Sequence, residues 1–174
     1  MIWSAASMIT YRLLQTRRHV YELLEGHETV AAITLRGETR AAVVTGGGNF
    51  DLETIEDVRR RVVRTAEHPS TVARASSLGR YAVDLEQATL YWQALPGPAR
   101  SCCWMTADGS IAIRYRPERE GTFTIECHAD ALPKEDRERA VILGAYLLLR
   151  IPLHPAPPEG HFWDPSPLPL PAEH

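Results

Sequence analysis

Hydrophobic side chains occupy every side of one segment near the C-terminal end of the chain. Residues 140–151 read AVILGAYLLLRI, so no polar stripe runs along the helix that this segment predicts. A helix without a polar face must be covered by other parts of the protein around its whole circumference. The segments before it alternate apolar and polar residues and are separated by turn residues, which is typical of short strands. We therefore expect an α+β fold in which an antiparallel β-barrel closes around a hydrophobic C-terminal helix.

Short alternating segments predict an antiparallel meander that begins at residue 9. The expected strands cover residues 9–14, 20–24, 29–35, 40–45, 71–76, 79–85, 89–94, 101–106, 110–116 and 122–128. The triple glycine at residues 46–48 breaks the pattern, and a short strand is expected at residues 50–52. Asp108 and Gly109 form the preferred pair for a tight hairpin turn, because glycine tolerates positive φ.

The last hairpin also suggests which residues face the helix. We expect Ile113 to lie opposite Ile125, because this register places apolar residues together on one face. The predicted inward face carries Trp104, Ile111, Ile113, Tyr115, Phe123 and Ile125. The opposite face carries polar residues and is expected to contact water.

Residues 54–67 predict one additional amphipathic helix. Their apolar positions recur at helical spacing, Thr54 and Asp57 resemble a capping box, and Pro69 follows as a stop signal. The basic residues on this helix are Arg59, Arg60, Arg61 and Arg64. Such a cluster is a candidate anion-binding surface for the phosphates of lipid head groups or nucleic acid. The alternative interpretation is a solvated helix face whose arginines pair with neighbouring acidic residues.

The hydrophobic helix has suitable ends. Pro133 suits the first helical position, Glu135 and Asp136 complement the positive end of the helix dipole, and Arg150 complements the negative end. The charged start of this helix, KEDRER, is expected to project from the barrel mouth. We expect residues 9–151 to form the barrel with its central helix. Residues 152–174 hold eight of the 13 prolines and predict an extended C-terminal tail.

Composition narrows the functional classes. A chain of 174 residues suits one domain, and its net charge of −3 argues against a dedicated nucleic-acid binder. The start of the chain lacks the basic and long apolar regions of a secretory signal. The hydrophobic helix is about 18 Å long, too short for a bilayer core of roughly 30 Å, so no transmembrane span is expected. We expect a cytoplasmic protein, located at the membrane periphery where it contacts lipid.

Candidate chemistry is sparse. The residue types of Cys102, Cys103, Cys127 and His128 are those that bind zinc. However, Cys102 and Cys127 are expected about 9.6 Å apart across the strands and about 6.8 Å apart along them, which excludes shared coordination. The glycines at 46–48 lack the Gly-Lys-Ser or Gly-Lys-Thr continuation of a phosphate-binding loop. We therefore expect no catalytic residues, no metal and no cofactor, and a protein that is not an enzyme.

The order of elements resembles the tubby C-terminal superfamily, which includes the LURP-one-related proteins and the phospholipid scramblases. The residues that carry the resemblance are SCCWMTADGSIAIRYR at 101–116, GTFTIECHA at 121–129 and AVILGAYLLLR at 140–150. The resemblance implies a barrel of about twelve strands filled by the C-terminal helix and, for some members, phosphoinositide or membrane-lipid binding. The basic pocket of tubby proteins has no matching lysine and arginine pattern here, and the cysteine-rich and calcium-binding stretches of scramblases are missing.

These observations together predict a non-enzymatic, tubby-like binding domain of the cytoplasm. Its expected partner is anionic phospholipid, bound through Arg59, Arg60, Arg61 and Arg64. The alternative is an interaction module that binds protein or nucleic acid through the proline-rich tail or the arginine-rich helix, with nucleic acid the less favoured partner.

Overall fold

A computed structural model describes residues 8–57, 60–65, 71–75, 81–96, 101–119, 121–128 and 131–150. The proline-rich tail expected at residues 152–174 lies outside these residues. The described strands are β1 (Met8–Arg17), β2 (Val20–Glu25), β3 (Glu28–Arg36), β4 (Arg40–Thr45), β5 (Gly48–Asp57), β6 (Arg60–Thr65), β7 (Thr71–Ala75), β8 (Tyr81–Asp84), β9 (Thr89–Ala94), β10 (Cys102–Met105), β11 (Ile111–Arg119) and β12 (Thr122–His128). They are followed by the helix α1 (Lys134–Arg150).

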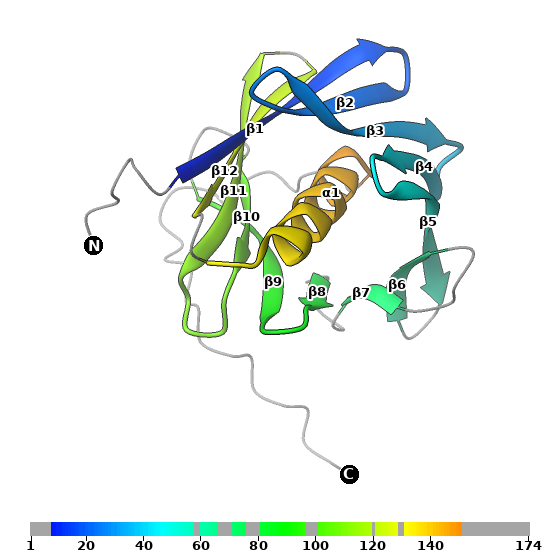
Figure 1. The fold of residues 1–174 in the computed structure, drawn as a ribbon. Helices are drawn as coiled ribbons and strands as arrows, with labels where there is room; N and C mark the ends of the chain where they lie inside the picture. Colours follow the sequence, from blue (N-terminus) through cyan, green and yellow to red (C-terminus); the bar gives the residue numbers. More distant parts are fainter. Residues whose placement is uncertain are drawn as a thin grey trace.

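Each strand pairs antiparallel with its neighbours in the chain. Strand β1 pairs with β2 on one side and with β12 on the other, so the order of strands closes on itself as a barrel. The ring of arrows surrounds α1 in Figure 1. A mostly antiparallel sheet with one helix confirms the expected α+β class.

Side-chain alternation explains how the strands form the inner wall. Along β1, Tyr11 and Leu13 are fully buried, whereas Thr10 and Arg12 between and beside them are exposed. Successive residues of a strand point to opposite faces, so this pattern places one set against the core and the other in solvent. The buried apolar residues of the other described strands, with the exception of Cys103, join the same core as those of α1.

The helix α1 is buried on all sides, as its sequence predicts. Every residue from Ala140 to Leu148 is buried. The charged start behaves differently from the expectation, because Asp136 and Arg137 are also buried. Arg137 Nε donates a hydrogen bond of 3.2 Å to the hydroxyl of Tyr11 on β1. The expectation that the whole charged start projects from the barrel is therefore wrong for these two residues.

A close contact at Gly144 fixes the middle of α1 against the wall. Trp104 Nε1 donates to the carbonyl of Ala140 at 2.9 Å, and the hydroxyl of Tyr115 lies 3.1 Å from the same oxygen and 3.0 Å from the carbonyl of Val141. A Cβ atom added at Gly144 would lie 2.1 Å from the Tyr115 hydroxyl. The missing side chain of Gly144 therefore lets two wall residues reach the backbone of the helix.

The last turns of α1 are tied to the β3–β4 turn. The hydroxyl of Tyr146 donates to the carbonyl of Thr39 at 3.1 Å and shares a hydrogen bond of 2.5 Å with the hydroxyl of Thr54 on β5. Arg150 donates to the carbonyls of Gly37 and Arg40. A cationic side chain at this end also complements the helix dipole. The helix therefore runs from the end of the barrel with the β2–β3 and β4–β5 turns towards the end with the β3–β4 turn.

The register of the last hairpin differs from the expectation by two residues. Ile113 pairs with Cys127, and Ile125 pairs with Tyr115. The chain turns later than expected, between Arg119 and Thr122, and a bulge between Pro117 and Arg119 changes the register by one residue. A shift of two residues keeps every side chain on its predicted face, which is why the inward residues Trp104, Ile113, Tyr115 and Ile125 are all fully buried.

The additional amphipathic helix expected at residues 54–67 is wrong. Residues 54–57 belong to β5 and residues 60–65 to β6, and the two strands pair from Leu52 opposite Thr65 to Asp57 opposite Arg60. Two features of this segment explain the error. Threonine, isoleucine and valine are frequent here and favour strands, while three consecutive arginines hide the two-residue alternation. Thr54 contacts Tyr146 and caps no helix.

Candidate ligand cleft at the barrel mouth

Three arginines of the predicted anion-binding surface, Arg60, Arg61 and Arg64, lie on β6. Arg59 lies outside the described residues. The ladder with β5 places Arg60 opposite Asp57, Arg61 opposite Glu56 and Arg64 opposite Glu53. By alternation, Arg61 falls on the same face of the ladder as Leu52, and Arg60 and Arg64 fall on the opposite face. The described positions therefore divide between the two faces of one strand.

The cysteines lie within the barrel wall, away from solvent. Cys102, Cys103 and Cys127 are free and buried. Cys102 pairs with Tyr115 and Cys127 with Ile113, so the two remain two residues apart along the sheet and two strands apart across it. Burial raises the pKa of each thiol to about 12, so the thiols stay protonated at neutral pH. Among the described residues, no group of three or more histidine, cysteine, aspartate or glutamate side chains could hold a metal ion.

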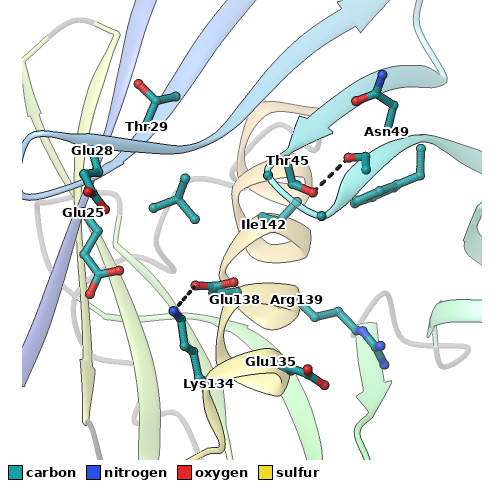
Figure 2. Close-up of a pocket in the computed structure, with 15 residues that line it drawn as sticks. Glu25, Glu28, Thr29, Thr45, Asn49, Lys134, Glu135, Glu138, Arg139 and Ile142 are labelled. Carbon is teal, nitrogen blue, oxygen red and sulfur yellow. Dashed lines mark hydrogen bonds and ion pairs between the residues drawn. The ribbon is translucent and has the colours of Figure 1, made fainter.

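An open cleft of about 760 Å³ lies where α1 enters the barrel. It is formed by the turn between β2 and β3, the turn between β4 and β5, and the first turns of α1, as Figure 2 shows. The residues that line it are Glu25, Glu28, Thr29, Val30, Thr45, Gly46, Gly47, Gly48, Asn49, Phe50, Lys134, Glu135, Glu138, Arg139 and Ile142. In an antiparallel meander, alternate turns lie at the same end of the sheet, so these two hairpins meet at one mouth.

The base of the cleft is apolar. Ile142 on α1 is buried, and Val30 and Phe50 are half-buried residues that pack against the core. Strand register explains the position of Phe50, because it pairs with Val43, which belongs to the inner face of β4. Opposite residues of a ladder share a face, so Phe50 also faces inward, near the end of its strand.

The rim of the cleft is mainly acidic. Glu25 and Glu28 lie on the β2–β3 side, and Glu135 and Glu138 lie on α1 (Figure 2). Against these four carboxylates the lining has two cationic side chains, Lys134 and Arg139, which leaves a net formal charge of −2. The ammonium of Lys134 lies 4.0 Å from a carboxylate oxygen of Glu138, so this cation is already close to an acidic partner.

Charged residues near the mouth affect the pKa of a tyrosine inside the barrel. Burial raises the pKa of Tyr11, the hydrogen bond from Arg137 lowers it, and the negative charge of Glu25 raises it further. Glu25 pairs with Tyr11 across β1 and β2, and so lies on the same inner face as the core residues. The carboxylate of Glu25 therefore lies at the boundary between the apolar interior and the cleft.

The described lining also carries the hydroxyls of Thr29 and Thr45. The hydroxyl of Thr45 donates to the carbonyl of Gly48 at 2.9 Å and thereby stabilises the turn. The cleft has an apolar base, a charged rim and an open volume, and these are general features of a ligand site.

Sequence reasoning identified none of these residues as a site. The glycines at 46–48 were expected only to break the strand pattern. One signal could have pointed to the cleft. Glu25 follows Leu23 at the two-residue spacing of inward positions on β2, and a charged residue at an inward position marks a barrel mouth or a polar cavity.

Comparison with known proteins leaves the family open. No family model matches the chain, and neither a curated protein nor a solved structure is significantly similar to it. The resemblance to the tubby C-terminal superfamily therefore stays a prediction. In the part of the chain that the structure describes, no helix has the length and apolar character needed to cross a bilayer.

Proposed function

We propose that this protein is a non-enzymatic binding domain and that the cleft at the barrel mouth is its binding surface. The observation that carries the proposal is the contrast between the filled interior of the barrel and its open mouth. The helix α1 fills the interior with buried side chains, whereas the mouth keeps an open volume of about 760 Å³ between two hairpins and the helix. A ligand held there contacts five elements at once, β2, β3, β4, β5 and α1.

The frame around the cleft supports this role. The helix is held at its middle by Trp104 and Tyr115 and at its far end by the β3–β4 turn. Both hairpins that form the cleft are continuous with the barrel wall. A site built on such elements changes little in shape when a ligand binds, which reduces the entropic cost of association.

Filling the cleft with a bulky side chain tests the proposal. A Cβ atom at Gly46 would meet no atom within 4 Å, so Gly46→Trp is expected to fold normally and to occupy part of the cleft. The immobilised wild-type protein is expected to enrich a common motif from phage-displayed random dodecapeptides, and Gly46→Trp is expected to lose that enrichment. The matched control is Thr10→Trp, at an exposed position of β1 that does not line the cleft.

Two results of this selection would contradict the proposal. One is equal enrichment of the same motif by the wild type and by Gly46→Trp, since the motif would then bind elsewhere. The other is the absence of any enriched motif with the wild type. Circular dichroism and thermal melting of both tryptophan variants show whether each retains the native fold.

Anionic phospholipid is a second candidate partner, and β6 is the element that would contact it. Arg60 and Arg64 lie on the face of the β5–β6 ladder opposite the inward residue Leu52, which is the face that a surface-binding strand needs. Asp57 and Glu53 lie opposite them in register, and Glu53 accepts hydrogen bonds from the guanidinium of Arg40 on β4. We propose peripheral membrane association as the consequence if these arginines contact lipid, in keeping with the predicted cytoplasmic location.

Liposome binding is the test of the lipid proposal. Vesicles containing phosphatidylserine or phosphoinositide are expected to retain the protein at low salt and release it as salt rises. Changing Arg59, Arg60, Arg61 and Arg64 to glutamine is expected to abolish retention, because each arginine near an anionic surface contributes up to about 1 kcal/mol. Arg61→Gln alone, on the other face of the ladder, is expected to have less effect than the pair Arg60→Gln and Arg64→Gln. Retention of the quadruple variant would exclude these arginines.

A further inference from the structure

We propose that the ligand of the cleft is a short basic peptide segment, in which lysine or arginine side chains flank an apolar residue. This inference rests on the proposed binding role of the cleft and adds the class of partner. It follows from the two-part character of the site, an apolar base under an acidic rim, and from its size.

The negative charge of the cleft rim favours a cationic partner. The rim has four carboxylates and two cations, and Lys134 already lies close to Glu138. Arg139 extends from the side of α1 away from Glu25 and Glu28 (Figure 2). Arg137 of α1 is buried and donates its hydrogen bond to Tyr11, and it does not line the cleft. Like charges across an interface are repelled, and a complementary potential attracts the partner and sets its orientation. An anionic head group or phosphopeptide is therefore disfavoured at this mouth.

The base of the cleft selects an apolar anchor beside the cation. Val30 and Phe50 are half-buried and Ile142 is buried beneath them, so a side chain placed on this base removes apolar surface from water. The aliphatic stems of lysine and arginine add to such contacts while their charged ends stay at the rim. A free inorganic cation would gain nothing from these residues.

Size limits the partner to a segment. A volume of about 760 Å³ is within the range of pockets that hold one small ligand, so a few side chains fit and a folded surface does not. The β4–β5 side includes the glycines at 46–48, and their lack of side chains lets another backbone approach closely at this turn. A short extended peptide meets both conditions.

Fluorescence anisotropy with defined peptides tests the class of partner. The probe is a fluorescein-labelled heptapeptide of sequence GKLRVKG, and the whole chain is used as the binding protein. We expect saturable binding that weakens about tenfold between low salt and roughly 0.3 M salt, because the rim carboxylates are exposed or half-exposed. The peptide GELEVEG, with glutamate at each basic position, is expected to show no binding, and GKSRSKG is expected to bind several-fold more weakly because it lacks the apolar anchors.

Paired variants locate the interaction at the rim. Glu28→Gln combined with Glu135→Gln removes two exposed cleft carboxylates from opposite sides of the mouth and is expected to weaken binding of GKLRVKG about tenfold. The matched control combines Glu38→Gln with Glu86→Gln, two exposed glutamates outside the cleft, and is expected to leave affinity unchanged. Both pairs change the net charge by the same amount, so their difference reports position and excludes a general charge effect.

The outcomes separate this inference from the proposed function. Equal binding of GKLRVKG and GELEVEG, equal effects of the two glutamine pairs, or no binding of GKLRVKG at millimolar concentration would overturn the basic-peptide assignment. A phage motif that depends on the open cleft but lacks lysine and arginine would do the same and leave cleft binding intact. If GKLRVKG binds Gly46→Trp as well as the wild type, the peptide binds outside the cleft and the basic-peptide assignment fails, whereas the phage selection decides separately whether the cleft binds a ligand.

Discussion

Replacing Leu147 with aspartate is expected to abolish cooperative folding. The side chain of Leu147 is 1% exposed and belongs to a run of buried helix residues inside the barrel, so the new carboxylate would be enclosed by apolar side chains. A buried and unpaired charge costs several kcal/mol or shifts to the protonated form at comparable cost. Domains of this kind are stable by only about 5–15 kcal/mol, so a loss of this size removes most of the free energy of unfolding. Near-ultraviolet circular dichroism and thermal melting are the measurements.

Leu147→Met is the matched control for this experiment. It keeps the volume and the apolar character of the side chain, and volume-conserving changes in a core cost less than about 1.5 kcal/mol. The methionine variant should therefore melt cooperatively within a few degrees of the wild type. An aspartate variant that is soluble and melts at the wild-type temperature would show that this position of α1 is not enclosed.

The sequence predicted α1 well because its signal is local. All-round apolarity between Ala140 and Leu148 is visible without any knowledge of partners, and only enclosure satisfies it. The faces of β10 to β12 were predicted for a similar reason. The register of the β11–β12 hairpin differs from the expected one by two residues, and a two-residue shift preserves the face of each side chain, so Trp104 and Tyr115 were assigned correctly to the interior.

The segment at residues 54–67 shows where local pattern is insufficient. The spacing of its apolar residues fits a helix when the segment is considered alone. Whether it forms a helix or strands is decided by the residues with which it pairs. β5 also pairs with β4, and Thr54 meets Tyr146, which is 92 residues away in the chain. Tertiary contacts of this kind override helix periodicity, and no window of neighbouring residues contains them.

The candidate site was beyond sequence reasoning for the same physical reason. Its walls come from two turns and from a helix more than 80 residues further along the chain, and only barrel closure brings Glu25 and Glu135 to one mouth. Gly46 and Gly47 lie in a turn, as expected, whereas Glu25 ends β2 and Gly48 begins β5. Their joint position depends on which end of the meander each turn occupies and on the direction in which α1 enters, and the structure supplies both.

Replacing Gly144 with alanine is expected to destabilise the protein by roughly 3–5 kcal/mol, from overpacking and the loss of buried hydrogen bonds. This destabilisation is opposite to the effect of helix propensity alone, because alanine in place of glycine in an exposed helix interior stabilises a helix by about 1 kcal/mol. Here the new methyl group would lie 2.1 Å from the hydroxyl of Tyr115 and 2.6 Å from Trp104 Nε1. The wall residues must move away, which breaks their hydrogen bonds to the carbonyl of Ala140. Urea denaturation at equilibrium measures the change.

A double-mutant cycle with Tyr115→Phe separates this steric conflict from a general effect of the substitution. In the wild-type background, loss of the hydroxyl removes hydrogen bonds to Ala140 and Val141 and is expected to cost about 1–2 kcal/mol. In the Gly144→Ala background the same change removes the atom nearest to the new methyl group, so its cost should shrink towards zero or reverse in sign. Gly46→Ala, in open space on the β4–β5 turn, is the neutral control. Additive effects of the two changes would mean that Gly144 does not make room for Tyr115, and that the helix is held against the wall by other contacts.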